Sequence, residues 1–219
     1  MQEKGENIPH GINPADSRIC ILIRHGESQT NVSFTYSTDE YRYPLTPYGV
    51  ESVENSGKRL ADVENIGKLY TSPVLRAKET AEIISRYVNI KPVIEPLLTE
   101  RGFGKYNNMK FDSRESMQKI KKEQMANNYD EWENWSGIVG RAGRFISSLK
   151  KGSVTVAISH MDFIKAAIAH MTGKDESGMT GIYIENASFT VIDPDGNPGE
   201  RILAIGSDAL PENIIWRTS

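Results

Sequence analysis

Two histidines stand where chemistry is expected, each just beyond an apolar run of strand length. His25 follows the run that ends at Arg24, and His160 follows the run at 153–158. Ligands of parallel α/β sheets bind beyond the carboxyl ends of the strands, so both imidazoles are expected at one edge of a sheet. A neutral imidazole nitrogen is available near neutral pH, and it is able to attack phosphorus and form a phosphohistidine.

Two arginines and two polar side chains are expected beside these histidines. Arg24 precedes His25, and Arg76 lies early in a helix expected to open at Ser72. Guanidinium groups bind a doubly charged phosphoryl group in bidentate fashion. Ser28 and Asn31 are expected at the start of the next helix, where they could donate hydrogen bonds to the same anion. The set indicates a site for a phosphate ester.

A phosphate monoester also needs an acid, because its alkoxide is a poor leaving group without a proton. Glu100 is the candidate for this carboxylic acid, facing the nucleophile across the phosphate. A metallohydrolase is the alternative, since Glu27 and Asp162 each lie two residues beyond a histidine. We favour structural roles for both: a loop anchor for Glu27, and for Asp162 a capping box with Ser159. Two arginines at the same edge would also repel a cation.

The residues around these groups resemble the signature of the histidine phosphatase superfamily, which includes cofactor-dependent phosphoglycerate mutases. The resemblance lies in ordered blocks at 24–28 with Asn31, 45–49, 71–81, 100–104 and 158–160. It implies His25 as phosphoryl acceptor, Glu100 as proton donor, and a set of phosphate ligands: Arg24, Arg76 and His160, with Ser28 and Asn31 as lesser contacts. It also implies that no metal or cofactor is needed.

Two departures from the family pattern concern the pocket. Met161 stands where the family usually has glycine after its second histidine, so a narrower or shifted pocket is expected. Tyr106, Asn107 and Asn108 replace the usual aromatic-acidic-glycine triplet, which alters the expected local turn and substrate contacts.

Three functions fit the resemblance. We favour a phosphatase that hydrolyses a small organic phosphate monoester through a phosphohistidine at His25. The first alternative is a phosphoglycerate mutase, whose pattern Glu100-Arg101 resembles. Mutases usually continue with His-Tyr-Gly and carry an adjacent arginine pair in the insertion; this chain has Gly-Phe-Gly at 102–104 and no such pair in 105–140. The second alternative, a binding module without turnover, would have no use for the acid at Glu100.

Alternating strand and helix patterns predict the scaffold that positions these residues. They favour a three-layer α/β/α sandwich with a largely parallel sheet. Thr46 and Ser72, each followed by proline, are expected to cap two of its helices. We expect a flexible leader at 1–17 and one domain at 18–219, with a helical insertion at about 103–150 beside the sheet.

The insertion itself is expected to be structural for the most part. Its aromatic and methionine side chains, among them Phe111, Trp132 and Trp135, are expected to form a small core of its own, although a substrate pocket is the alternative. One apolar helical face is expected to be core: Ile138, Ala142, Phe145 and Leu149. The lysines at 119, 121 and 122 are expected to be a solvated face, with substrate binding as the alternative.

The overall composition indicates which kind of partner the protein binds and where it is located. The net charge of −3 provides no basic field for nucleic acid or an anionic membrane, so a small phosphorylated substrate is the expected partner. Cys20 is the one cysteine and is expected to be a buried hydrophobe. The polar start at 1–6 does not resemble a signal peptide, and the expected location is the cytoplasm.

Overall fold

The computed structural model describes residues 17–127 and 131–214, so most of the expected leader lies outside the described residues. Its six-stranded sheet has the order β3-β2-β4-β1-β5-β6. The strands are β1 (Cys20–Arg24), β2 (Ile66–Thr71), β3 (Val93–Ile94), β4 (Val154–Ser159), β5 (Phe189–Ile192) and β6 (Ile202–Ser207). The first four run parallel, while β5 and β6 are antiparallel to their neighbours. The predicted largely parallel sheet is confirmed.

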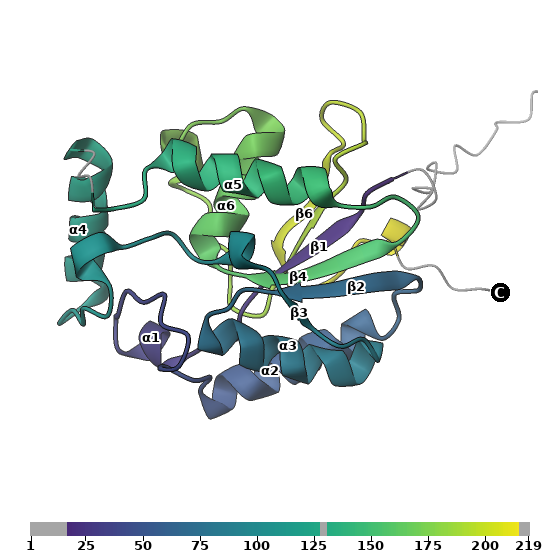
Figure 1. Cartoon of the computed structure of the whole chain (residues 1–219), viewed down its shortest axis with the longest axis horizontal. Helices are drawn as coiled ribbons and strands as arrows, with labels where there is room; N and C mark the ends of the chain where they lie inside the picture. The colour runs from purple at the N-terminus through teal and green to yellow at the C-terminus, as the bar shows by residue number, and fades with distance from the viewer. Residues whose placement is uncertain (1–16, 128–130, 215–219) are drawn as a thin grey trace, which may run out of the picture.

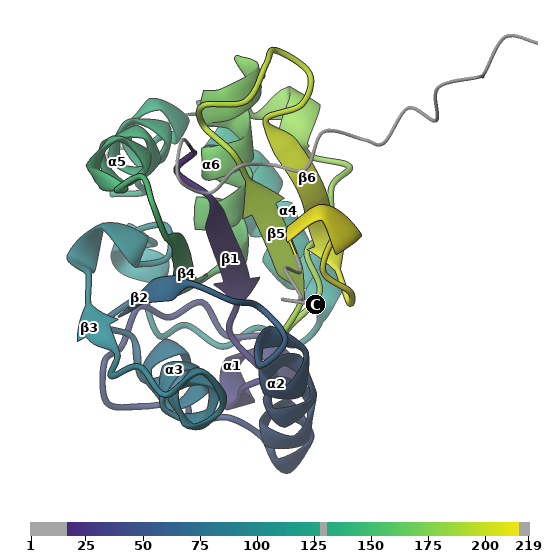
Figure 2. The ribbon, with the colours of Figure 1, turned by 90° about the vertical axis from the view of Figure 1, so that its right-hand side faces the viewer.

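Helices cover both faces of this sheet (Figure 2). One face carries α2 (Pro47–Leu60) and α3 (Leu75–Val88), and the other carries α5 (Trp135–Ser148) and α6 (Met161–Thr172). The short α1 (Gln29–Val32) and α4 (Arg114–Asn127) lie beyond the edge at which β1 and β4 end (Figure 1). The three-layer sandwich is therefore confirmed. None of the helices in the described ranges is long and apolar enough to cross a membrane.

Side chains of β1 alternate between the two cores of the sandwich, as the period of a strand requires. Ile21 and Ile23 pack with α2 and α3, whereas Cys20 and Leu22 pack with α5 and α6. All four are fully buried, and burial raises the pKa of the Cys20 thiol. The strand is covered on both faces, which explains its unbroken apolar sequence.

Helix starts follow the sequence signals in one case and depart from them in two. Thr46 caps α2 as predicted, its Oγ1 accepting from the Gly49 N–H at 3.0 Å. Helix α3 begins at Leu75, two residues later than a cap at Ser72 requires. The predicted capping box of Ser159 and Asp162 is wrong, because β4 continues through Ser159 and its hydroxyl donates to the Leu98 carbonyl at 2.7 Å.

The segment 103–150 divides into two parts, so its reading as one insertion beside the sheet needs correction. Its last helix, α5, is part of the sandwich, because its predicted apolar face packs against α6 and β4: Ile138, Ala142, Phe145 and Leu149. Residues 103–127 do stand beside the sheet. Phe103 and Trp132 form a separate small core, and Phe111 and Met117 pack around it, but Tyr36 from outside the insertion completes this core, so it is not the insertion's own as predicted.

Candidate active site

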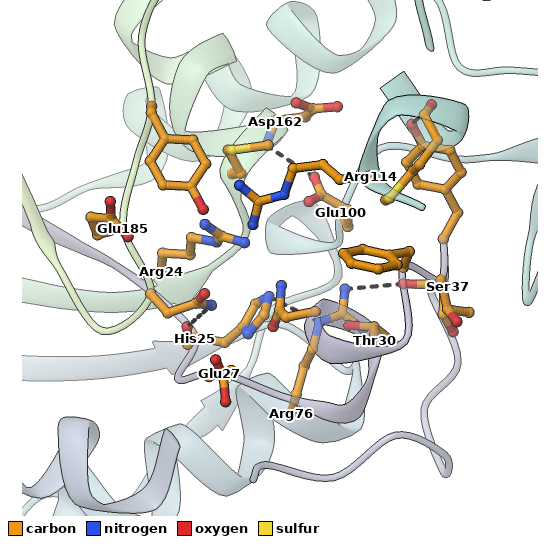
Figure 3. Close-up of a pocket in the computed structure, with 18 of the residues that line it drawn as sticks. Arg24, His25, Glu27, Thr30, Ser37, Arg76, Glu100, Arg114, Asp162 and Glu185 are labelled. Carbon is orange, nitrogen blue, oxygen red and sulfur yellow. Dashed lines mark hydrogen bonds between the residues drawn. The ribbon is translucent and has the colours of Figure 1, made fainter. Parts of the chain in front are cut away.

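A cavity of about 560 Å³ opens beyond the carboxyl ends of β1 and β4 (Figure 3). The parallel pairing places Arg24 opposite Ser159, so the residues that follow them are neighbours. The ring centroids of His25 and His160 are 5.0 Å apart. Arg76, Glu100 and Asn31 line the same cavity with Arg24 and His25. The structure thus brings the sequence-predicted residues to one sheet edge.

The hydrogen bonds of His25 define its tautomer. Arg76 Nε–H donates to His25 Nε2 at 2.9 Å, so Nε2 carries the lone pair. The opposite nitrogen, Nδ1, lies 2.7 Å from the Gly26 carbonyl and must be the one that donates. Burial, with the charges of Arg76 and Arg24, holds the pKa of His25 well below its ordinary value. The imidazole is therefore neutral, as a nucleophile must be.

The two arginines have buried N–H groups that no described residue accepts. Arg24 Nη1 donates to the Ile184 carbonyl at 2.6 Å, and Arg76 Nη2 donates to the Ser37 carbonyl at 3.0 Å. Arg24 Nε and Arg76 Nη1 have no acceptor within the described ranges. Burial, together with the nearby Arg24, lowers the pKa of Arg76 to about 10. Two desolvated cations with spare donors make a strong anion site.

Glu100 lies on the wall of the cavity across from His25 and Arg76 (Figure 3). It is 8% exposed, and its Oε1 accepts from the backbone N–H groups of Arg101 at 2.9 Å and Asp162 at 3.2 Å. Burial and the Asp162 carboxylate raise the pKa of Glu100. A carboxyl that stays protonated to higher pH is able to donate a proton to a leaving group.

The neighbouring carboxylate, Asp162, is driven the other way by a lysine from α4. Lys121 Nζ donates to both carboxylate oxygens of Asp162, at 2.6 and 2.8 Å. Burial would raise the pKa of Asp162, but the Lys121 ammonium outweighs it and the pKa is lowered. The predicted solvated role of Lys121 is wrong, because α4 places this ammonium against α6. The surroundings therefore move the pKa values of these two carboxyls in opposite directions.

His160 and Ser28 lie behind the cavity and do not line it. His160 Nδ1 accepts from Arg76 Nη2 at 3.1 Å, and its Nε2 donates to Ser72 Oγ at 2.8 Å. Ser28 is fully buried, with its Oγ 3.0 Å from Asn31 Oδ1. His160 thus orients Arg76 and Ser28 orients Asn31, and both of these partners line the cavity. Direct phosphate contact by His160 and Ser28 stays a prediction.

Comparison with known proteins places this geometry in a family. The model of the histidine phosphatase superfamily (branch 1) matches residues 20–205. The chain belongs to this superfamily. It is 32% identical to the 2,3-bisphosphoglycerate-dependent phosphoglycerate mutase of Thermoplasma acidophilum, over 90% of this chain and 96% of the relative. It is 27% identical to the adenosylcobalamin/alpha-ribazole phosphatase of Escherichia coli, over 78% and 88% of the two chains.

Solved structures agree with this assignment. The alpha-ribazole phosphatase of Shigella flexneri superposes with a TM-score of 0.69 at 25% identity, covering 88% of this chain and 98% of that one. This histidine phosphatase superfamily member is thus an enzyme of the histidine phosphatase type, with relatives named both phosphatase and mutase. The family resemblance expected from the motif blocks is confirmed.

The carboxylates considered for a metal site both have other partners. Glu27 Oε1 accepts from Thr46 Oγ1 at 2.7 Å, which anchors the loop as expected, and Asp162 is paired with Lys121. Across residues 17–127 and 131–214, no group of three or more potential ligands (His, Cys, Asp or Glu) is arranged to hold a metal ion. Catalysis without a metal stays a prediction, as it was from the sequence.

Of the two departures from the family pattern, the one at 106–108 has a structural role and the one at Met161 borders the cavity. Asn107 Oδ1 accepts from the Thr38 N–H at 2.9 Å, and Asn108 Oδ1 accepts from Ser37 Oγ at 2.7 Å. They hold the loop whose Ser37 carbonyl orients Arg76. Met161 lines the cavity wall beside Asp162.

Several pocket residues carry no signal in the local sequence. Asn186 Nδ2 donates to the His25 carbonyl at 2.9 Å, and Tyr183 lies under the Arg24 guanidinium, 5.8 Å from ring centroid to Cζ. Arg114 reaches from α4 across the cavity toward Arg24 (Figure 3). These side chains come from segments that only the folded chain brings to the sheet edge.

Proposed function

We propose that this enzyme is a phosphatase that hydrolyses a small organic phosphate monoester through a phosphohistidine at His25. The observation that carries the proposal is the lone pair on His25 Nε2, which accepts from Arg76 in a cavity lined by two arginines with unpaired N–H groups. Nε2 attacks phosphorus while the ester P–O bond breaks, and Glu100 gives its proton to the departing oxygen. Water then attacks the phosphohistidine, inorganic phosphate leaves, and Glu100 regains a proton from that water.

Arg76 has to change partners during this cycle. Its Nε–H occupies the nucleophilic lone pair in the structure described here. A phosphoryl oxygen would take over this N–H and so free Nε2 for attack. The spare N–H groups of Arg24 and Arg76 would hold the remaining oxygens and neutralise charge that develops in the transition state.

The first test is a covalent intermediate. Brief incubation with an excess of a labelled phosphate monoester should give an acid-labile label on the protein, together with release of inorganic phosphate. His25→Ala should lose both, with turnover falling by roughly a thousandfold or more for loss of a nucleophile. His170→Ala, which removes an exposed histidine at the end of α6, is the matched control and should behave as wild type. Label retained in His25→Ala would overturn the assignment.

Mutase activity is the second candidate, since a phosphoglycerate mutase is 32% identical over most of the chain. The position of Arg101, the second residue of the mutase-like pair Glu100-Arg101, argues against mutase activity. Arg101 is 2% exposed, donates to the Glu133 carbonyl and to Glu176, and does not line the cavity. It is therefore not placed to hold a substrate carboxylate there.

A direct assay separates the two activities. With 3-phosphoglycerate and a catalytic amount of 2,3-bisphosphoglycerate, we expect phosphate release to exceed formation of 2-phosphoglycerate. Isomerisation that outpaces phosphate release would make the enzyme a mutase and leave the phosphohistidine chemistry unchanged. No turnover of any phosphate ester would favour the binding-module alternative.

A further inference from the structure

A second cavity of about 380 Å³ adjoins the active site. It lies between α4, α6 and the segment at 176–183. Lys121, Met161, Asp162 and Tyr183 line both cavities, so the two adjoin along these side chains. The Lys121–Asp162 ion pair marks the boundary between the two cavities, because both side chains line both of them. A molecule bound at His25 could therefore extend past this pair into the second cavity.

The walls of the second cavity are largely apolar. Met125, Trp135, Met179 and Ile182 line it, and none of them lines the active site itself. Of the insertion's side chains expected to form a core of their own, Met125 and Trp135 are therefore partly exposed to this cavity instead. Such a wall suits a hydrocarbon segment, whose transfer from water is favourable in proportion to the area buried.

Lys165, on α6, supplies a cation to this apolar cavity. Its side chain is 8% exposed, and its ammonium makes no hydrogen bond or ion pair with any residue in the described ranges. The cavity's acidic side chains are engaged elsewhere: Asp162 with Lys121, and Glu176 with Arg101. The Asp162 and Glu100 carboxylates attract this ammonium without forming an ion pair with it, so part of the cost of its burial is not offset. Burial and the nearby Lys121 accordingly lower the pKa of Lys165.

We propose that the second cavity binds the far end of the substrate, a carboxylate carried on an apolar chain, with Lys165 as its counter-ion. The inference rests on the proposed function, because it presupposes a phosphate ester at His25. It names the substrate class as phosphate monoesters of long hydroxy acids. The carboxylate pairs with the Lys165 ammonium, and the chain covers Met161 and Met179.

Chain length is the discriminating property. The phosphoryl group has to reach His25 while the carboxylate passes the Lys121–Asp162 pair, so a short hydroxy acid cannot occupy both sites. The test compares phosphate release from phosphorylated ω-hydroxy acids, from glycolic to hydroxydecanoic acid, with release from the methyl esters of the same compounds. Each acid is compared with its own methyl ester through the ratio of their kcat/KM values. A variant that changes the rate of phosphoryl transfer itself affects both compounds equally and leaves this ratio unchanged.

In the wild-type enzyme this ratio should rise with chain length and reach about tenfold or more, the usual effect of a hydrogen bond to a charged group. Lys165→Met should abolish the rise, and Lys165→Arg should retain part of it. Lys119→Met removes an exposed lysine of α4 that lines neither cavity and should keep the wild-type ratio.

Each outcome separates the two proposals. Phosphate release with a ratio that does not depend on chain length in the wild-type enzyme overturns the subsite, whether or not Lys165→Met folds. A rise that persists in Lys165→Met also overturns it. Absence of phosphate release from every ester would instead contradict the proposed function.

Discussion

Burial shifts the pKa values of His25 and Glu100 in opposite directions. Removal from water disfavours the charged form of any group, so it lowers the pKa of a histidine and raises that of a carboxyl. Burial lowers the pKa of His25, which favours its neutral form, and raises the pKa of Glu100, which favours its protonated form. A neutral nucleophile and a protonated acid are the two states that attack on a phosphate monoester requires.

Substitution of Glu100 tests this assignment through the leaving group. Glu100→Gln should slow phosphorylation by an alkyl phosphate by ~10²–10⁴-fold, because the alkoxide needs the proton. An aryl phosphate such as nitrophenyl phosphate should lose far less, since nitrophenolate leaves without help. The phosphorylation step has to be followed by burst kinetics, because Glu100 also serves the second step. Equal losses for the two substrates would mean that Glu100 positions the pocket and donates no proton.

Besides burial, charges on the surrounding helices act on the pKa of Glu100. Helix α6 places the Asp162 carboxylate beside Glu100, and α4 places the Lys121 ammonium on Asp162. The charges of Arg76 from α3 and Lys121 from α4 oppose the effect of Asp162 on the pKa of Glu100. The insertion therefore contributes to catalysis through the helix that carries Lys121.

Asp162→Asn tests this arrangement of helices. Loss of the carboxylate removes a negative charge that raises the pKa of Glu100, and it leaves Lys121 unpaired nearby. Both changes favour ionised Glu100. Activity on an alkyl phosphate requires the protonated form, so its alkaline limb should move to lower pH than in wild type. Asp112→Asn, at an exposed residue, is the control and should leave the limb in place. An unchanged limb in Asp162→Asn would exclude the coupling.

Burial of the two active-site histidines makes the stability of the whole domain depend on pH. His25 and His160 are almost completely enclosed, and burial holds the pKa of each well below its ordinary value of 6.5. In the unfolded chain both would bind protons near pH 6.5. Between that pH and the lower folded pKa, the unfolded state binds more protons, so acidification favours unfolding.

The free energy of unfolding should therefore be fully retained above pH 6.5 and should fall as the pH drops below that value. Urea denaturation from about pH 8 to pH 5 measures this dependence, within the range in which histidines titrate. His25→Asn removes one of the two buried imidazoles and should reduce the slope. A variant with the wild-type slope would show that other groups govern stability in this range.

The sequence by itself determined the sandwich and the residues at its strand ends. An unbroken apolar run predicts a strand covered on both faces, and parallel strands bring their carboxyl ends to one edge. Those two rules placed Arg24 and His25 at the sheet edge where the cavity opens, while Arg76 was assigned from an expected helix start and Glu100 from the need for an acid and the family resemblance. Thr46 was predictable, since a cap depends on its immediate neighbours.

Only the tertiary structure decided which charged side chains reach the site from elsewhere. Lys121 and Asp162 are 41 residues apart, and nothing in a run of lysines tells which one faces inward. The predicted capping box of Ser159 and Asp162 is wrong because β4 extends one residue further than the local pattern implies. The unpaired ammonium of Lys165 depends on what α4 and the 176–183 segment place around it. Burial and long-range contacts set these charges, and neither is a property of a short stretch of sequence.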